Sequence, residues 1–184
     1  MTFQDQEFLD RDPRIARVLI GSVDLQRRVT ELGREVSAEY TSEDPPILVS
    51  ILKGGVVFLA DLIRSMTVAH EIDFMAVSSY TGQNTTGVVK INMDLQASIT
   101  DRHVLIVEDI VDTGLTLTHL LELLSARKPK SVRVCALLNK VDARRKEVRI
   151  DHTGFDIPDE FVIGYGLDYN EHYRNLPFIG VLRG

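Results

Sequence analysis

The stretch VLIVEDIVDTGLTLTHLLELL, from Val104 to Leu124, begins as an apolar run that is interrupted by two adjacent acids, Glu108 and Asp109. A third acid, Asp112, follows, and a Thr-Gly pair then leads into a segment with helical periodicity. This pattern predicts a buried strand, a turn and a helix, with the acids where the strand ends. Because buried charges are costly without partners, the two neighbouring carboxylates indicate a ligand.

The turn from Asp112 to Thr116 offers two hydroxyls, a glycine and the free N–H groups of a helix start. These features suit a phosphate, which backbone donors and the helix dipole can hold. The nearby carboxylates would repel a bare phosphate, so the ligand must also carry donors or a cation. Adjacent carboxylates accept hydrogen bonds from a vicinal diol, and they hold Mg²⁺ directly or through its waters. A phosphate and a diol in one small molecule describe a ribose 5-phosphate.

A second segment, SILKGGVVFLADLI from Ser50 to Ile63, has the same strand-turn-helix layout. Its glycines, Gly54 and Gly55, let the backbone approach a ligand closely, and Lys53 adds positive charge. This segment predicts a second anion site, for example for pyrophosphate. A plain turn with a solvated lysine is the alternative.

The rest of the chain alternates apolar strands with amphipathic helices. Helices are expected at 56–66 and 116–126, and another is expected to begin with Ser22 as its N-cap. Strands are expected at 17–21, 47–51, 70–79, 88–95, 103–107 and 131–138. Strands without polar alternation are buried on both faces, so an α/β fold with a mostly parallel sheet flanked by helices is predicted. Such sheets bind ligands at the carboxyl ends of their strands, where both turns fall.

Length, charge and cysteine content narrow the class of protein. A chain of 184 residues is expected to form one domain, residues 1–184. The formal net charge of -6 argues against bulk binding to nucleic acid or to an anionic membrane. The single cysteine, Cys135, allows no internal disulfide, and the N-terminus lacks the features of a signal peptide. A cytoplasmic protein is therefore expected.

Other functions explain the acids less well. The glycine patterns of dinucleotide-binding folds and of P-loops are absent, and the histidines lack zinc-type spacing. An aspartyl-phosphate hydrolase requires two aspartates one residue apart, whereas Asp109 and Asp112 are three apart. A role as a helix N-cap in a solvated loop would explain Asp112 alone, but not the Glu-Asp pair before it.

The segment VLIVEDIVDTGLTL resembles the signature with which type I phosphoribosyltransferases bind 5-phosphoribosyl pyrophosphate (PRPP). With LKGG, SSYTG, LLNK and DEFVIGYGLDYNEHYR, residues 17–182 resemble the bacterial hypoxanthine-guanine branch of this family. The resemblance implies the type I phosphoribosyltransferase fold, with a small hood built from the C-terminal segment and the N-terminus. It also implies a purine salvage enzyme that converts hypoxanthine or guanine and PRPP to IMP or GMP and pyrophosphate.

The resemblance assigns the PRPP end of the site. Glu108 and Asp109 are implied to hold the ribose hydroxyls and the Mg²⁺ shell, and Asp112 is the implied catalytic acid or base. Pyrophosphate is implied to bind at Lys53 and Gly54, after a cis peptide bond between Leu52 and Lys53. The 5′-phosphate is implied to lie in a cradle formed by Thr113, Gly114, Leu115 and Thr116.

The purine end and the lid are assigned in the same way. Lys140 is implied to bind the purine 6-oxo group, Phe161 to stack on the base, and Val162 to contact the edge of the base. Taken alone, Phe161 is more often a core aromatic in such a segment, and Lys140 is more often a solvated lysine at a strand end. The remaining implied residues are Asp168, near the purine and a second Mg²⁺, Arg174, facing pyrophosphate, and Ser79 and Tyr80, in a closing lid.

The expected partners are therefore small molecules, PRPP and a 6-oxopurine, with Mg²⁺ as cofactor. No nucleic acid or membrane partner is expected. The chain is expected to form a homodimer or a homotetramer. Two alternatives remain open. One is a nucleotide-sensing, RNA-binding regulator on the same fold, which would need a basic face, and the other is a xanthine-preferring phosphoribosyltransferase.

Overall fold

The computed structural model describes residues 2–79 and 89–183, with only the backbone described at Ser79 and Val89. Its main feature is a six-stranded sheet in the order β4-β3-β2-β5-β6-β7. All neighbouring pairs are parallel except β3 and β4, so the expected mostly parallel sheet is confirmed. The strands are β2 (Ile47–Leu52), β3 (Glu71–Ser79), β4 (Val89–Met93), β5 (His103–Val111), β6 (Ser131–Asn139) and β7 (His152–Asp156).

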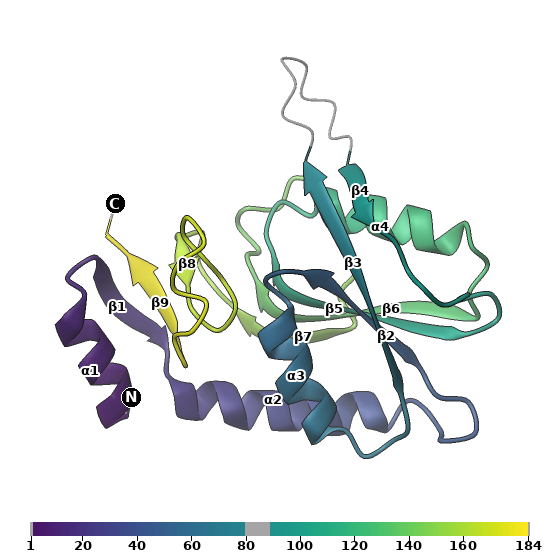
Figure 1. Ribbon diagram of the computed structural model, residues 1–184, viewed down its shortest axis with the longest axis horizontal. Helices are drawn as coiled ribbons and strands as arrows, with labels where there is room; N and C mark the ends of the chain where they lie inside the picture. The colour runs from purple at the N-terminus through teal and green to yellow at the C-terminus, as the bar shows by residue number, and fades with distance from the viewer. Residues whose placement is uncertain (1, 80–88, 184) are drawn as a thin grey trace.

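Helices cover both faces of this sheet (Figure 1). Helices α2 (Ser22–Ser37) and α3 (Val56–Ser65) pack on one face, and α4 (Leu115–Ser125) packs on the other. Successive residues of β5 serve the two layers in turn: Leu105 joins the α2–α3 core, whereas Ile106 joins the α4 core. This burial on both faces explains why the central strands are apolar without alternation.

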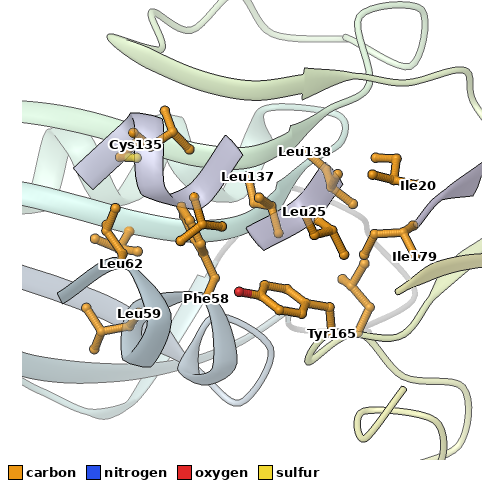
Figure 2. Close-up of a cluster of buried hydrophobic side chains, with 14 of the residues drawn as sticks. Ile20, Leu25, Phe58, Leu59, Leu62, Cys135, Leu137, Leu138, Tyr165 and Ile179 are labelled. Carbon is orange, nitrogen blue, oxygen red and sulfur yellow. The ribbon is translucent and has the colours of Figure 1, made fainter. Parts of the chain in front are cut away.

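Figure 2 shows the core between the sheet and the α2–α3 layer. Leu25 of α2 and Phe58 and Leu62 of α3 have no exposed surface, and they pack with Cys135 of β6. The thiol is therefore a buried apolar group, as its apolar context predicted, and burial raises the pKa of Cys135 above its ordinary value.

A second, three-stranded sheet forms a hood from the two ends of the chain. Its order is β1-β9-β8, with β1 at Ile15–Ile20, β8 at Val162–Ile163 and β9 at Ile179–Leu182. Helix α1, Phe3–Arg11, precedes it, and the ring of Phe8 meets that of Phe178 edge-on at 6.1 Å between centroids. The hood agrees with the expectation, although α1 itself was not predicted.

Two local expectations are corrected. Strand β5 continues to Val111, so Glu108 and Asp109 lie within the strand, near its carboxyl end, rather than after it. Ser22 is the first residue of α2 and not its cap; the N-cap is Gly21, and the Ser22 hydroxyl instead lies 3.5 Å from that of Thr2. Strand β7 had no clear periodic signal. Within the described residues no helix is both long and apolar enough to span a bilayer.

Candidate active site

Two adjoining hollows lie at the carboxyl ends of β2, β5 and β6. The smaller, about 190 Å³, is lined by Glu108 and by the turn that leads into α4. The larger, about 320 Å³, runs from Lys53 to Phe161 and Arg174. Ile110 and Asp112 line both hollows, so one ligand can extend from one to the other. The site is thus where the carboxyl ends of the strands were predicted to place it.

The smaller hollow is an anion cradle at the start of α4. Gly114 is the N-cap of this helix and has φ +81°, a left-handed conformation that glycine adopts without strain. A Cβ at this position would also overlap the carbonyl oxygen of Lys146. The loop is held from outside, because the N–H groups of Arg145 and Lys146 both donate to the Thr113 carbonyl at 3.0 Å. Thr116 and Leu117, in the first turn of α4, line the hollow, where the N-terminus of a helix favours an anion.

Glu108 and Asp109 bring one buried and one partly buried carboxylate to the junction of the hollows. Burial and the neighbouring charge of Asp109 raise the pKa of Glu108 well above its ordinary value. Burial raises the pKa of Asp109 to about 6, against the opposing effects of the Ile110 N–H and the charge of Arg174. Neither carboxylate forms an ion pair with any described residue. Such a pair favours a ligand that brings a cation or several donors.

Lys53 and Arg174 supply positive charge at the opposite wall. The peptide bond between Leu52 and Lys53 is cis, as the resemblance implied, and the Lys53 ammonium lies 3.0 Å from the Glu171 carboxylate. Arg174 contacts the Asp168 carboxylate at 2.9 Å and donates to the Gly166 carbonyl at 2.8 Å. This wall is suited to a polyanion such as pyrophosphate.

Glycines bring the two walls together. A Cβ at Gly54 would overlap the carboxylate of Asp109, and a Cβ at Gly166 would overlap the carbonyl oxygen of Gly54. Gly166 also has φ +101°, which disfavours any other residue. The turn after β2, the acids of β5 and the loop after β8 are therefore in direct contact.

A cation and an aromatic ring form the far end of the larger hollow. Lys140 follows β6, and only 9% of its side chain is exposed. Its ammonium lies 3.3 Å from the Asp159 carboxylate and 3.9 Å from that of Asp112. Phe161 is 55% exposed, and its ring meets the ring of Tyr169 edge-on. The simpler alternatives for both residues are therefore wrong, because Lys140 is not solvated and Phe161 is not a core aromatic.

The described residues show no cluster of three or more groups able to hold a metal. A transition-metal centre is not what this donor set suits. A magnesium ion needs fewer protein ligands, because it keeps several waters and binds through one or two carboxylates plus substrate phosphates. The oxygen-only pair Glu108 and Asp109, and separately Asp168, fit that mode.

The structure brings together nearly all the residues singled out from the sequence. Val162 begins β8 and lines the larger hollow together with Phe161, the residue before it. Leu115 and Thr116 are exposed at the start of α4. The expected lid is the exception: Ser79 ends β3, and Tyr80 lies outside the described residues. Asp159, Gly166 and Glu171 were not assigned roles, although all three stand inside the DEFVIGYGLDYNEHYR motif.

Comparison with known proteins gives consistent relatives. Residues 23–170 match the family of phosphoribosyl transferase domains. The hypoxanthine-guanine phosphoribosyltransferase of Bacillus subtilis (strain 168) is 48% identical over 171 residues, with 92% of this chain and 94% of that protein covered. The hypoxanthine phosphoribosyltransferase of Escherichia coli (strain K12) is 48% identical, with 89% and 93% covered. A crystal structure of the hypoxanthine phosphoribosyltransferase from Staphylococcus aureus matches with a TM-score of 0.89 and 45% identity over 93% of both chains.

Proposed function

Because this chain belongs to the phosphoribosyl transferase family, we propose that it is a purine salvage enzyme that converts PRPP and hypoxanthine or guanine to a nucleoside 5′-monophosphate and pyrophosphate. The single observation that carries this proposal is that one site joins an anion-binding end and a base-binding end. An anion cradle beside two carboxylates fits a phosphorylated ribose, and a buried ammonium beside an exposed aromatic ring fits a base with a 6-oxo group.

The ribose end is proposed to hold PRPP through charge and backbone donors. The 5′-phosphate would occupy the cradle formed by Thr113, Gly114, Leu115 and Thr116. Glu108 and Asp109 would accept hydrogen bonds from the ribose hydroxyls, which compensates their burial. Pyrophosphate would lie against Gly54, Lys53 and Arg174, whose charges stabilise the leaving group as its bond to the anomeric carbon breaks.

The base end is proposed to orient the purine for attack by its ring nitrogen. The Phe161 ring would stack on the base, and the Lys140 ammonium would donate to the 6-oxo group. Val162 and Asp168 would contact the other edge. Asp112 lies between the two ends and is the proposed general acid or base for the proton at N7, a contribution typically worth about 10²–10⁴-fold in rate.

We also propose Mg²⁺ as the cofactor, held by Glu108, Asp109 and, at a second position, Asp168. When bound, the ion supplies charge neutralisation for the leaving pyrophosphate. The carboxylates orient the ribose and its phosphates, and the protein walls shield the reacting carbon from water. Tyr80 and Ser79 remain the proposed lid.

Setting and assembly are further proposals. A reducing cytoplasm is supported by the single, buried Cys135. A homodimer or homotetramer is supported by analogy with the family, and a trypanosomal relative has been studied for its oligomeric state.

The RNA-binding alternative is disfavoured by the net charge of -6. Relatives carry both hypoxanthine and hypoxanthine-guanine in their names, so preference among hypoxanthine, guanine and xanthine is left to experiment.

A substrate panel tests the proposal. Purified protein with PRPP and Mg²⁺ is assayed against hypoxanthine, guanine, xanthine, adenine and uracil, with product followed by absorbance and chromatography. Hypoxanthine or guanine should be converted and adenine barely, because adenine places an amino donor against the donor Lys140. Lys140→Ala should reduce 6-oxopurine turnover and narrow the discrimination against adenine. Adenine turnover equal to that of hypoxanthine in the unmodified protein would contradict both the assignment and the role of Lys140.

A further inference from the structure

Lys140 is a nearly buried cation with two acidic neighbours at unequal distances. Its ammonium hydrogen-bonds the Asp159 carboxylate at 3.3 Å, whereas the Asp112 carboxylate at 3.9 Å lies beyond hydrogen-bonding distance. The backbone of Lys140 is fixed separately, since its N–H donates to the Val111 carbonyl at 3.0 Å. The backbone of Lys140 is therefore fixed, and only a change in its side-chain conformation can bring the ammonium closer to one carboxylate or to the other.

Asp159 is held in place by the segment that joins β7 to β8. Ile157 is buried and its N–H donates to the Asn139 carbonyl at 2.9 Å, while the Glu160 N–H donates to the Pro158 carbonyl at 2.8 Å. The two adjacent acids point to different partners. Asp159 faces Lys140, whereas Glu160 pairs with Arg17 at 2.6 Å on the hood.

An ammonium has three donors, so Lys140 can keep Asp159 and still donate to a base in the hollow. Without Asp159, the nearest anion would be Asp112. Because a buried ammonium needs a partner, its side chain would then move toward Asp112 and away from the base. That movement would also engage the carboxylate proposed to handle the N7 proton.

We propose that Asp159 is a positioning residue for the reaction: it holds the Lys140 ammonium at the purine 6-oxo position and keeps Asp112 free for its proton. This inference rests on the proposed function and adds to it a group outside the set of residues that would touch substrate. Asp159 itself is 58% exposed in its side chain, so it acts from the rim of the hollow.

The experiment compares Asp159→Ala with Glu160→Ala, two neighbouring truncations at an exposed and a partly exposed position. Steady-state kinetics are measured with hypoxanthine and PRPP varied in turn, and thermal unfolding is followed in parallel. Asp159→Ala should raise the KM for hypoxanthine about tenfold and lower kcat, because loss of a charged hydrogen bond releases Lys140. The KM for PRPP should change by less than about twofold, since the ribose end is untouched. Asp159→Glu, which retains the carboxylate, should recover most of the hypoxanthine KM.

Glu160→Ala should leave both KM values unchanged, because exposed ion pairs contribute little. The inference is overturned if the unmodified protein uses hypoxanthine but Asp159→Ala behaves like Glu160→Ala. It is also overturned if Asp159→Ala lowers only the melting temperature, or if both KM values rise together. A protein that uses no 6-oxopurine at all would instead overturn the proposed function, and this inference with it.

Discussion

At the scale of single residues, Glu108 and Asp109 carry an electrostatic cost in the ligand-free protein. Their raised pKa values mean that the folded protein binds protons more tightly than the unfolded chain does. For Asp109 the window runs from the ordinary value of 3.8 to about 6. As pH rises through this window, the unfolded state releases its proton first, so the free energy of unfolding falls. Above the folded-state pKa of Asp109, the full electrostatic cost of its buried charge reduces the free energy of unfolding.

The double variant Glu108→Gln/Asp109→Asn should therefore be more stable than the unmodified protein at pH 7 without ligand. A gain of about 3 kcal/mol is expected from Asp109 alone, and it should largely disappear below about pH 4. The same variant should lose the stabilisation that PRPP and Mg²⁺ give the unmodified protein. Melting temperatures at both pH values, with and without ligand, check this. An equal response of both proteins to PRPP would show that these acids do not bind the ribose.

At the scale of elements, the site depends on loops that approach one another at glycines. The loop after β8 lies on the turn after β2, because Gly166 stands where a side chain would overlap the carbonyl oxygen of Gly54. Arg174 strengthens this contact through its hydrogen bond to the Gly166 carbonyl. The position of Lys53 and the position of Asp168 are thus set by one shared backbone contact.

Gly166→Ala should disturb this contact and strain the backbone, with a loss of stability of about 1–3 kcal/mol. Catalytic activity should fall by more than the loss of folded protein accounts for, because the turn that carries Lys53 and Gly54 must shift. Gly180→Ala is the control: its φ is not left-handed, and its closest neighbours are side-chain atoms of Phe178 and Ile15 at 3.1 and 3.3 Å. Chemical denaturation and steady-state assays compare the two. If they behaved alike, the close approach of the two loops would be of no consequence.

At the scale of the whole molecule, the hood is joined to the main sheet through a buried tyrosine. Tyr165 follows β8 and packs in the core beside Phe58 of α3 (Figure 2). Its hydroxyl donates to the Asp61 carboxylate at 2.5 Å, and burial together with this bond raises the pKa of Tyr165, which keeps the donor proton in place. Asp61 lies on α3, directly after the pyrophosphate turn. One hydrogen bond therefore ties the base end to the PRPP end.

Tyr165→Phe should lower the free energy of unfolding by about 1–2 kcal/mol, because it removes this bond and leaves a carboxylate less well satisfied. A modest loss of kcat/KM should accompany it. Tyr40→Phe is a matched control, since the Tyr40 hydroxyl is buried without a hydrogen-bond partner among the described residues. Its removal should be neutral or stabilising. Urea titrations measure the free energy of unfolding of both variants. A smaller loss of stability in Tyr165→Phe than in Tyr40→Phe would show that the hydrogen bond between Tyr165 and Asp61 does not stabilise the fold.

Several parts of the fold and site followed from local pattern alone. The central strands were readable because burial on both faces requires uninterrupted apolar residues, and the turns were readable from their glycines. The end of β5 was placed too early, because Glu108 and Asp109 interrupt the apolar run, although Glu108 still pairs with Ala136 of β6 and the pairing continues to Val111. Helix α1 was missed because it lacks a strong apolar stripe; the one local signal it carries is the capping box between Thr2 and Asp5.

The sequence by itself determined the class of the fold, the order of the central strands and of helices α2, α3 and α4, and the chemistry of the turn around Asp112. These properties depend on residues close together in the chain, whose periodicity and turn types are set by short-range sterics and burial. Only the tertiary structure decided how the strands from the two ends of the chain pair in the hood, that Phe161 is exposed to the hollow, and that Asp159 faces Lys140 across 19 residues. Such contacts have no local signature, because they exist only when distant segments are brought together by packing of the core.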